Sequence, residues 1–345
     1  MLLKDFDYEL PKELIAQVPS QKREMSRMMV LDKCLRTIDD KHFFNIVDCL
    51  DENDLLVLNN TKVIPARLYG RKDTGALIEI FLVKETEPKI WTALVKPSKR
   101  IQPGTIIKIS DELSVKALAK DDDKWKIELL YDGNIYEILS NVGNIPLPPY
   151  IERRMTSEDF KALDYDRYQT VYAEKEGSVA APTAGLHFTQ DILKQLEAKG
   201  VEHCFVNLNV GLGTFKPVKC DDILEHKMDS ESFEISQATA QTINEAKAKG
   251  KNIVAVGTTS VRTLETTMKK CGQIQEIHDA SELFIYPGYE FKIVDKLVTN
   301  FHLPKSTLLM LVSAMAGKDF IFNAYHHAIE EQYRFYSYGD CMLIK

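Results

Sequence analysis

The sequence predicts an α/β protein: a main body with a mixed sheet, and an antiparallel β-barrel inserted into it. Strands alternate with helices over the second half of the 345-residue chain, which is typical of a partly parallel sheet covered on both faces. Short strands with no helix between them fill the preceding segment, which favours a small barrel or sandwich. We therefore expect the body to comprise residues 1–61 and 146–345, and the barrel to comprise residues 62–145.

The first part of the body contains few elements. We expect a short helix over residues 12–17, a strand over 28–31, a helix over 41–50 that Asp40 caps, and a buried strand over 55–58. The barrel follows as six strand-like runs separated by turn signals, over residues 63–69, 76–84, 90–96, 105–109, 113–119 and 124–131. The proline-rich stretch 143–150 is expected to be extended and to lead back to the body.

The second part of the body has clear starts and stops. Ser236 is a good N-cap, and Gly200, Gly250 and Gly272 each follow a helical pattern. These signals predict helices over residues 190–199, 237–249, 260–270, 306–316 and 319–333. Strands are expected over 201–210, 252–256 and 297–301, with a terminal strand after the Gly339-Asp340 turn.

Composition excludes several classes of protein. With 44% apolar and 28% charged residues the chain is neither disordered nor fibrous. Its longest apolar run, residues 307–317, is too short to cross a bilayer, and residues 1–6 do not resemble a secretory signal. The six cysteines contain no C-x-x-C pair, so we expect free thiols, a cytoplasmic location and no structural zinc. A P-loop, a G-x-S-x-G motif and an H-E-x-x-H motif are all missing from the sequence.

Charge is unevenly distributed. The net charge is −7, but residues 62–108 hold ten basic and four acidic residues, a local excess of +6 that leaves −13 for the rest. Phosphate binding depends on the local potential, so a basic module on an acidic body suits a protein that holds RNA as well as a small substrate. A solvated strand face would explain the same charge about equally well.

Polar residues gather at three turns that lead into helices. Open α/β sheets bind ligands beyond the carboxyl ends of their strands. The first turn has three adjacent hydroxyls, Thr258, Thr259 and Ser260, which suit a carboxylate or phosphate, although Ser260 alone would be an ordinary cap. The other two turns contain His302 and His187, each of which is either an acid or base or a structural histidine.

Read in order, these turns belong to a longer series of motifs. They are FDYELP at 6–11, RYQTVYA at 167–173, GSVAAPTAGLHFT at 177–189, VGLGTF at 210–215, GTTSVRTLE at 257–265, IYPGY at 285–289, NFHLPKSTLLM at 300–310 and YRFYSYGD at 333–340. The series resembles the S-adenosylmethionine:tRNA ribosyltransferase-isomerase family of queuosine biosynthesis, nearly from end to end. Three positions depart from the family pattern: Lys62 stands in place of an arginine, and Asn209 and Asp229 in place of histidines.

The resemblance implies a function. The family transfers and isomerises the ribosyl part of S-adenosylmethionine onto 7-aminomethyl-7-deazaguanine at the wobble position of a tRNA. The product is epoxyqueuosine, and adenine and methionine are released. S-Adenosylmethionine is thus a consumed substrate, and neither a metal nor a tightly bound cofactor is implied. We expect no membrane partner, and a monomer or weak homodimer.

Candidate roles follow from the chemistry and the resemblance together. A base and an acid are needed, for which His187 and His302 are candidates, and Glu231 or Asp340 is expected to pair with the substrate amine. Thr258, Thr259 and Ser260 are expected to hold the methionine carboxylate, and Tyr168, Phe215 and Tyr286 to stack on a base. Further substrate-binding candidates are Gln169, Thr183, Gly185, Gly213, Thr214, Arg262 and Asn300. The candidates for tRNA binding are Lys62, Arg67, Arg71, Lys96, Lys99, Arg100 and Arg153.

Two alternative functions remain open at this point. A tRNA methyltransferase would use the same two ligands, but the sequence has no glycine-rich nucleotide loop. A non-catalytic RNA-binding protein would use the barrel alone, and would not need the hydroxyl- and histidine-containing turns of the body. Turnover separates these functions, whereas RNA affinity does not.

Overall fold

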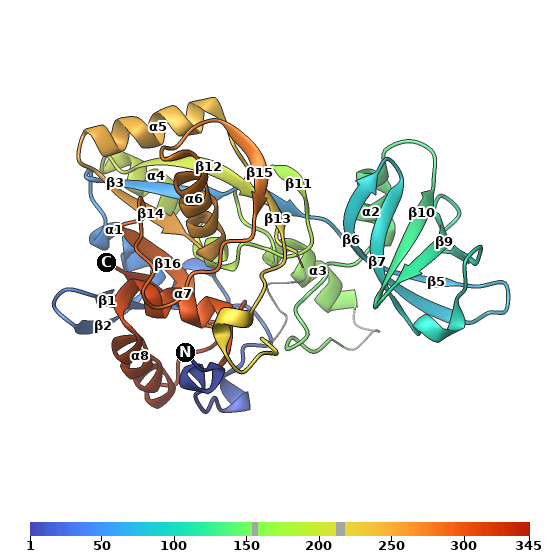
Figure 1. The fold of residues 1–345 in the computed structure, drawn as a ribbon, viewed down its shortest axis with the longest axis horizontal. Helices are drawn as coiled ribbons and strands as arrows, with labels where there is room; N and C mark the ends of the chain where they lie inside the picture. The colour runs from blue at the N-terminus through green and yellow to red at the C-terminus, as the bar shows by residue number, and fades with distance from the viewer. Residues whose placement is uncertain (154–157, 212–217) are drawn as a thin grey trace.

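The computed structural model describes residues 1–153, 158–211 and 218–345, and it has two parts. A large α/β body and a smaller β-barrel lie side by side, joined by a narrow connection (Figure 1). The predicted fold class, a mixed-sheet body with an inserted antiparallel barrel, is confirmed.

The body is built on a nine-stranded sheet of mixed direction. Its central strands β12, β3, β14 and β16 are mutually parallel, whereas β17 runs antiparallel to β16 and parallel to β1. Antiparallel strands complete both sides. In sheet order the strands are β15 (Ile277–Ser281), β13 (Glu231–Ile235), β12 (Glu202–Leu208), β3 (Asp54–Asn59), β14 (Asn252–Val256), β16 (Lys296–Asn300), β17 (Cys341–Ile344), β1 (Arg27–Asp32) and β2 (Thr37–His42).

Helices cover both faces of this sheet, so the middle positions of its central strands are mostly apolar. All six residues of β3 are buried. Leu55 and Val57 pack on the side of α5 (Gln237–Ala248), α6 (Thr258–Cys271), α7 (Thr307–Ala316) and α8 (Lys318–Glu330). Leu56 and Leu58 pack on the opposite side, with α1 (Ile46–Cys49) and α4 (Gln190–Ala198). This burial on both faces explains the continuous apolar runs in the sequence.

The six predicted barrel strands are confirmed. They close in the order β10 (Lys124–Leu130), β7 (Ile90–Lys96), β6 (Leu77–Glu87), β5 (Arg67–Arg71), β8 (Ile106–Lys108) and β9 (Ser114–Asp121). Alternate residues point inward, so that Ile78, Ile80 and Leu82 of β6 are fully buried. Helix α2 (Ile135–Val142) packs against this barrel core.

The barrel is attached where the central strands of the body end. After β3 the chain forms β4 (Thr61–Val63), which pairs with β11 (Lys175–Ser178), and then enters β5. It returns beside its point of entry: the Arg67 N–H donates to the Asn144 carbonyl at 3.1 Å, and the Asn144 N–H to the Arg67 carbonyl at 2.9 Å. The barrel therefore lies at the carboxyl edge of the sheet.

Most predicted helices are confirmed, with two instructive differences. Ser236 caps α5 as predicted, accepting from the Thr239 N–H at 3.2 Å. Ser306, predicted as the first residue of a helix, is the cap of α7 and accepts from the Leu309 N–H at 3.2 Å. Helix α6 begins at Thr258, because Gly257 (φ +86°) is the cap residue and the Ser260 hydroxyl bonds to the Val256 carbonyl instead. The predicted helix 41–50 is shorter than expected, because β2 extends to His42 before the 3₁₀ turn Phe43–Asn45 and α1.

Other elements escaped prediction. They are the edge strands β2 and β15, strands β11 and β13, and helices α2 and α3 (Glu158–Arg167). Further 3₁₀ turns are Leu3–Phe6, Lys12–Leu14, Arg23–Met25, Ser98–Arg100, Thr183–His187 (η6) and Ile223–Glu225. All six cysteines are free thiols. In the described part of the chain no single helix can span a membrane; α7 and α8, bent by 114°, satisfy length and composition only as a pair.

Gly143 lies where the returning chain passes closest to its entry. A Cβ atom there would lie 2.1 Å from the Pro65 carbonyl oxygen and 2.7 Å from that of Leu139. Gly143→Ala is therefore expected to destabilise the barrel by about 1–3 kcal/mol through overpacking. Denaturant unfolding followed by tryptophan fluorescence measures this, because Trp91 and Trp125 both lie in the barrel core. Asn141→Ala is the control, because Asn141 is exposed on α2, the helix that ends just before Gly143. Equal denaturant midpoints for the two variants would contradict the prediction.

Candidate functional site

The carboxyl ends of the parallel strands meet at one edge of the sheet, as the polar turns predicted. Val256 of β14 pairs with Val298 of β16, so the start of α6 and the end of β16 are neighbours. The 3₁₀ turn η6 packs beside β16 at this edge. Three of the motifs identified in the sequence therefore meet in space.

These turns enclose a cavity of about 70 Å³. Besides Tyr150 and Ser306, polar residues from four segments of the chain line it. They are Thr183 of η6; Thr258 and Thr259 of α6; Thr299, Asn300 and His302 at the end of β16; and Tyr336 and Ser337 near the carboxyl-terminal strand. We call this space the sheet-edge cavity. Its position matches the rule for ligand binding in open α/β sheets.

The start of α6 supplies donors to this cavity. Thr258 and Thr259 are each 8% exposed, and the N–H groups of the first helical turn have no intrahelical partner. The Thr259 hydroxyl accepts a hydrogen bond from the Asn59 amide at 3.3 Å. This arrangement of free N–H groups and a helix dipole favours an anion.

His302 lies in the wall of the cavity. Its Nε2 is 2.9 Å from the Thr299 hydroxyl, and among the described residues nothing hydrogen-bonds to its Nδ1. Its backbone is fixed by the Tyr325 hydroxyl at 2.9 Å. Burial lowers the pKa of His302 to about 3, so the ring is neutral near pH 7.

His187 lies behind the cavity instead. Its Nδ1 is 2.6 Å from the Ser26 hydroxyl, and its Nε2 is 3.1 Å from the Asn300 amide nitrogen. Burial, with the nearby charges of Arg23 and Arg334, lowers its pKa to about 3. Both ring nitrogens are therefore occupied, and the ring reaches the cavity only through Asn300.

The two candidate carboxylates are also occupied. Asp340 accepts the backbone N–H of Arg27 at 2.8 Å and that of Arg334 at 2.7 Å. Burial raises its pKa, even though these hydrogen bonds favour the ionised form. Glu231 forms a buried ion pair with Arg262 and accepts the Gly211 N–H at 2.8 Å. These carboxylates hold the ends of strands and loops at the site.

Glu265 is a buried carboxylate near the site that the sequence patterns did not single out. It is fully buried and accepts three consecutive backbone N–H groups, from Lys292, Ile293 and Val294, at 2.9–3.2 Å. The Tyr289 hydroxyl adds a fourth donor at 3.0 Å. Glu265 thereby fixes the loop that leads into β16. Its place in the motif GTTSVRTLE was the only signal for it.

Several predicted substrate-binding residues lie outside the cavity. Tyr168 is fully buried, with its ring 5.8 Å from that of Tyr338. The Gln169 amide pairs with both backbone groups of Val63, at 3.0 and 3.2 Å, and so holds the connection to the barrel. Gly185 packs so tightly against Tyr172 that a Cβ would lie 2.1 Å from its hydroxyl. Tyr286 contacts Phe284. The predicted residues Gly213, Thr214 and Phe215 lie outside the described residues.

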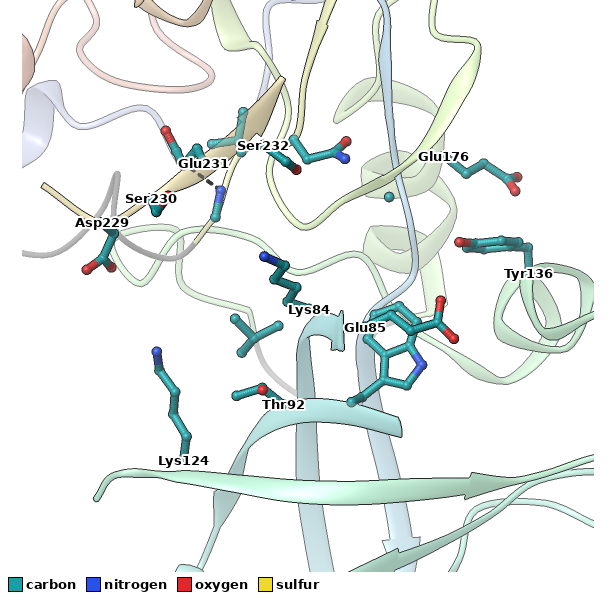
Figure 2. A pocket seen from close by; sticks show the side chains of 16 residues that line it. Lys84, Glu85, Thr92, Lys124, Tyr136, Glu176, Asp229, Ser230, Glu231 and Ser232 are labelled. Carbon is teal, nitrogen blue, oxygen red and sulfur yellow. Dashed lines mark hydrogen bonds between the residues drawn. The ribbon is translucent and has the colours of Figure 1, made fainter. Parts of the chain in front are cut away.

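A second, larger space of about 440 Å³ separates the barrel from the body. We call it the interdomain cleft. Lys84 and Lys124 extend from the barrel toward Asp229, Ser230 and Glu231 on the body side (Figure 2). Val210 lines both the cleft and the sheet-edge cavity, so the two spaces are adjacent.

The predicted tRNA-binding residues fall into two groups. Arg153 is held by Asp164 in a two-bond ion pair at 2.8 and 2.9 Å, Lys62 pairs with Glu176 at 3.2 Å, and Arg67 pairs with Glu79 at 3.5 Å. Exposed residues form the second group, which makes no ion pair with any described residue; it comprises Arg71, Lys96, Lys99 and Arg100. A hydrogen bond of 3.0 Å from Trp125 to Ser98 fixes the turn that carries Lys99 and Arg100.

The low pKa of His302 predicts a specific acid sensitivity. The unfolded chain binds a proton at this ring near pH 6.5, whereas the folded chain does so only near pH 3. Between about pH 3 and pH 6.5 the free energy of unfolding should therefore increase with pH and decrease on acidification. The His302 ring alone contributes up to about 1.4 kcal/mol per pH unit to this slope. His302→Gln should reduce the slope of the unfolding free energy against pH by up to about 1.4 kcal/mol per pH unit. Urea unfolding followed by circular dichroism between pH 4.5 and 6 measures this slope. The exposed His278→Gln is the control; identical slopes for wild type and His302→Gln would contradict the prediction.

Comparison with known proteins agrees with this architecture. Residues 3–344 match the family described as "Queuosine biosynthesis protein". The S-adenosylmethionine:tRNA ribosyltransferase-isomerase of Clostridioides difficile (strain 630) is 51% identical to this chain over 348 residues. The enzyme of the same name from Sulfurihydrogenibium sp. (strain YO3AOP1) is 53% identical over 345 residues. Each alignment covers 100% of this chain and 100% of the relative. The crystal structure of S-adenosylmethionine tRNA ribosyltransferase from Thermotoga maritima matches with a TM-score of 0.57 at 40% identity, covering 99% of this chain and 100% of that one. This chain therefore belongs to the queuosine biosynthesis family of S-adenosylmethionine:tRNA ribosyltransferase-isomerases, as the ordered motifs predicted.

Proposed function

We propose that this enzyme transfers the ribosyl part of S-adenosylmethionine to 7-aminomethyl-7-deazaguanine at the wobble position of a tRNA and isomerises it to the epoxide of epoxyqueuosine. Adenine and methionine leave. The observation that carries the proposal is the adjacency of two spaces of different size, the sheet-edge cavity and the interdomain cleft, in a chain of this family. The smaller space suits the methionine end of S-adenosylmethionine, and the larger one a nucleotide of the tRNA.

The cavity has the groups that S-adenosylmethionine requires. The N–H groups at the start of α6 suit the methionine carboxylate. The reaction begins when a base removes a proton from the ribose carbon next to the sulfonium, whose fixed positive charge acidifies that carbon. His302 lines the cavity with Nδ1 unoccupied among the described residues, and it is our candidate for this base. The buried walls limit attack by water on the intermediates.

The cleft has the charge that the RNA substrate requires. The amine of the precursor base is cationic until it loses a proton. Three carboxylates line the body side of the cleft and make it acidic: Glu176 and Glu231, which pair with Lys62 and Arg262, and Asp229. Lys84 and Lys124 on the barrel side suit the phosphates that flank this base. The ylide that deprotonation of the ribose carbon gives expels adenine, the amine then attacks the ribosyl unit, and methionine leaves as the epoxide closes. S-Adenosylmethionine is consumed, and the cytoplasm is the expected location.

The products test the proposal directly. The wild-type enzyme is mixed with S-adenosylmethionine and a tRNA that carries the precursor base, and the small molecules and tRNA mass are measured. We expect equal amounts of adenine and methionine, with a matching mass gain on the tRNA. S-Adenosylhomocysteine would instead indicate methyl transfer. Tight tRNA binding by folded protein without turnover would indicate a binding protein.

Charge reversal on the barrel tests how the tRNA is held. Lys96→Glu, Lys99→Glu and Arg100→Glu each remove an exposed cation from the barrel, so each should weaken tRNA binding. For every phosphate that the protein no longer neutralises, the plot of log K against log salt should become shallower by about one unit. Lys194→Glu, at an exposed position of α4 on the body, is the matched control for net charge. Salt slopes equal to those of the control would contradict the assignment of these residues.

A further inference from the structure

The side chain of Asn300 has one unsatisfied atom. Asn300 is 3% exposed and lines the sheet-edge cavity. Its Nδ2 lies 3.1 Å from His187 Nε2, 3.1 Å from the Tyr336 carbonyl oxygen and 3.2 Å from the Asp340 carbonyl oxygen. Carbonyl oxygens only accept, so the NH₂ group must face them. The Oδ1 atom is buried and has no hydrogen-bond partner among the described residues.

A chain of hydrogen bonds fixes the tautomer of His187. The Ser26 hydroxyl donates to the Arg23 carbonyl at 3.1 Å, so its oxygen accepts from His187 Nδ1–H at 2.6 Å. Nε2 is then unprotonated and accepts from the Asn300 amide. His187 is therefore a positioning residue that orients Asn300, and it has no free nitrogen with which to touch a substrate.

The unsatisfied oxygen requires a donor. A buried acceptor without a partner costs free energy, and a ligand that supplies a donor removes this cost. Two carboxylates, Asp340 and Glu231, were expected to pair with the substrate amine, and both have partners already. Asp340 accepts two backbone N–H groups, and Glu231 binds Arg262 and the Gly211 N–H. Among these three candidates, Asn300 Oδ1 alone is without a partner in the described structure.

Strand β14, which lies beside β16, indicates the chemical class of the donor that binds Asn300 Oδ1. The start of α6 follows β14, which pairs directly with β16, so the first residues of α6 and Asn300 line one cavity from adjacent strands. An α-amino acid carries a carboxylate and an ammonium group on the same carbon. We infer that Asn300 Oδ1 accepts a hydrogen bond from the α-ammonium group of the methionine part of S-adenosylmethionine, while the carboxylate binds at the start of α6. This inference rests on the proposed function.

Binding measurements test this without relying on turnover. Calorimetry gives the Kd of the full-length protein for S-adenosylmethionine and for analogues that lack the α-amino group or one ribose hydroxyl. A hydrogen bond to a charged donor is worth about 10- to 150-fold in affinity. The wild type should lose about this factor with the des-amino analogue, and Asn300→Ala should lose it with S-adenosylmethionine but show no further loss with the des-amino analogue. If the lost affinity followed a ribose hydroxyl instead, the assignment to the ammonium group would be overturned.

A second pair of variants tests His187 and covers the case that Asn300→Ala does not fold. His187→Gln retains a side-chain acceptor for the Asn300 amide, whereas His187→Leu does not. A positioning role predicts that His187→Gln keeps kcat within about threefold of the wild type, and that His187→Leu raises the Kd for S-adenosylmethionine at least about fivefold. A collapse of kcat in both variants with unchanged Kd would make His187 an acid or base and overturn the inference.

Failure of the proposed function has a different signature. Wild-type protein that binds S-adenosylmethionine with the predicted analogue pattern, yet releases no adenine with precursor tRNA, would overturn the proposed reaction and support the inference. Wild-type protein that turns over normally, but binds the des-amino analogue as tightly as S-adenosylmethionine, would overturn the inference alone.

Discussion

Polar side chains buried at the carboxyl edge of the sheet must be paired, and this constraint organises the site. Ser26, His187 and Asn300 form a continuous line of hydrogen bonds from the start of β1 to the carbonyl groups that precede β17. Each member has only one arrangement that satisfies its neighbours, because the line ends on backbone carbonyls. The geometry of the cavity is thus determined before a ligand enters.

Buried carboxylates play a matching role. Asp340 joins the start of β1 to the turn before β17, and Glu265 fixes the loop before β16 through three backbone N–H groups. Glu231 holds Gly211 at the end of the β12 segment. In each case an ionised group replaces water as the partner of backbone donors, and such charge-assisted hydrogen bonds are among the stronger ones in proteins. All three carboxylates therefore bind backbone donors at this edge of the sheet, and the catalytic roles expected for Glu231 and Asp340 stay predictions.

The convergence of the turns after β14 and β16 could be predicted from the sequence, because parallel strands share a carboxyl edge, the three hydroxyls follow β14 and His302 follows β16. That His302 lines the cavity whereas both nitrogens of His187 are hydrogen-bonded could not be predicted, because the second fact depends on Ser26, which is 161 residues from His187 in the chain. Arg153 was assigned to phosphate for its charge, whereas its partner Asp164 lies on a helix, α3, that the sequence pattern did not indicate. The edge strands β2 and β15 were missed because they contain few apolar residues, which is typical of strands with one open side.

The position of β17 has a consequence for how this protein is made. Although β17 follows every other described strand in the sequence, it lies between β16 and β1, with Cys341 paired to both Asn300 and Met28. During synthesis the ribosome must therefore release residues 341–344 before the β1–β2 hairpin can join the sheet, so the hairpin waits for more than 300 residues of chain. The Asp340 carbonyl that orients Asn300 arrives at the same moment. A chain that terminates before β17 thus lacks the strand that joins β1 to β16, and its unpaired strand edges make it a substrate for chaperones and proteases.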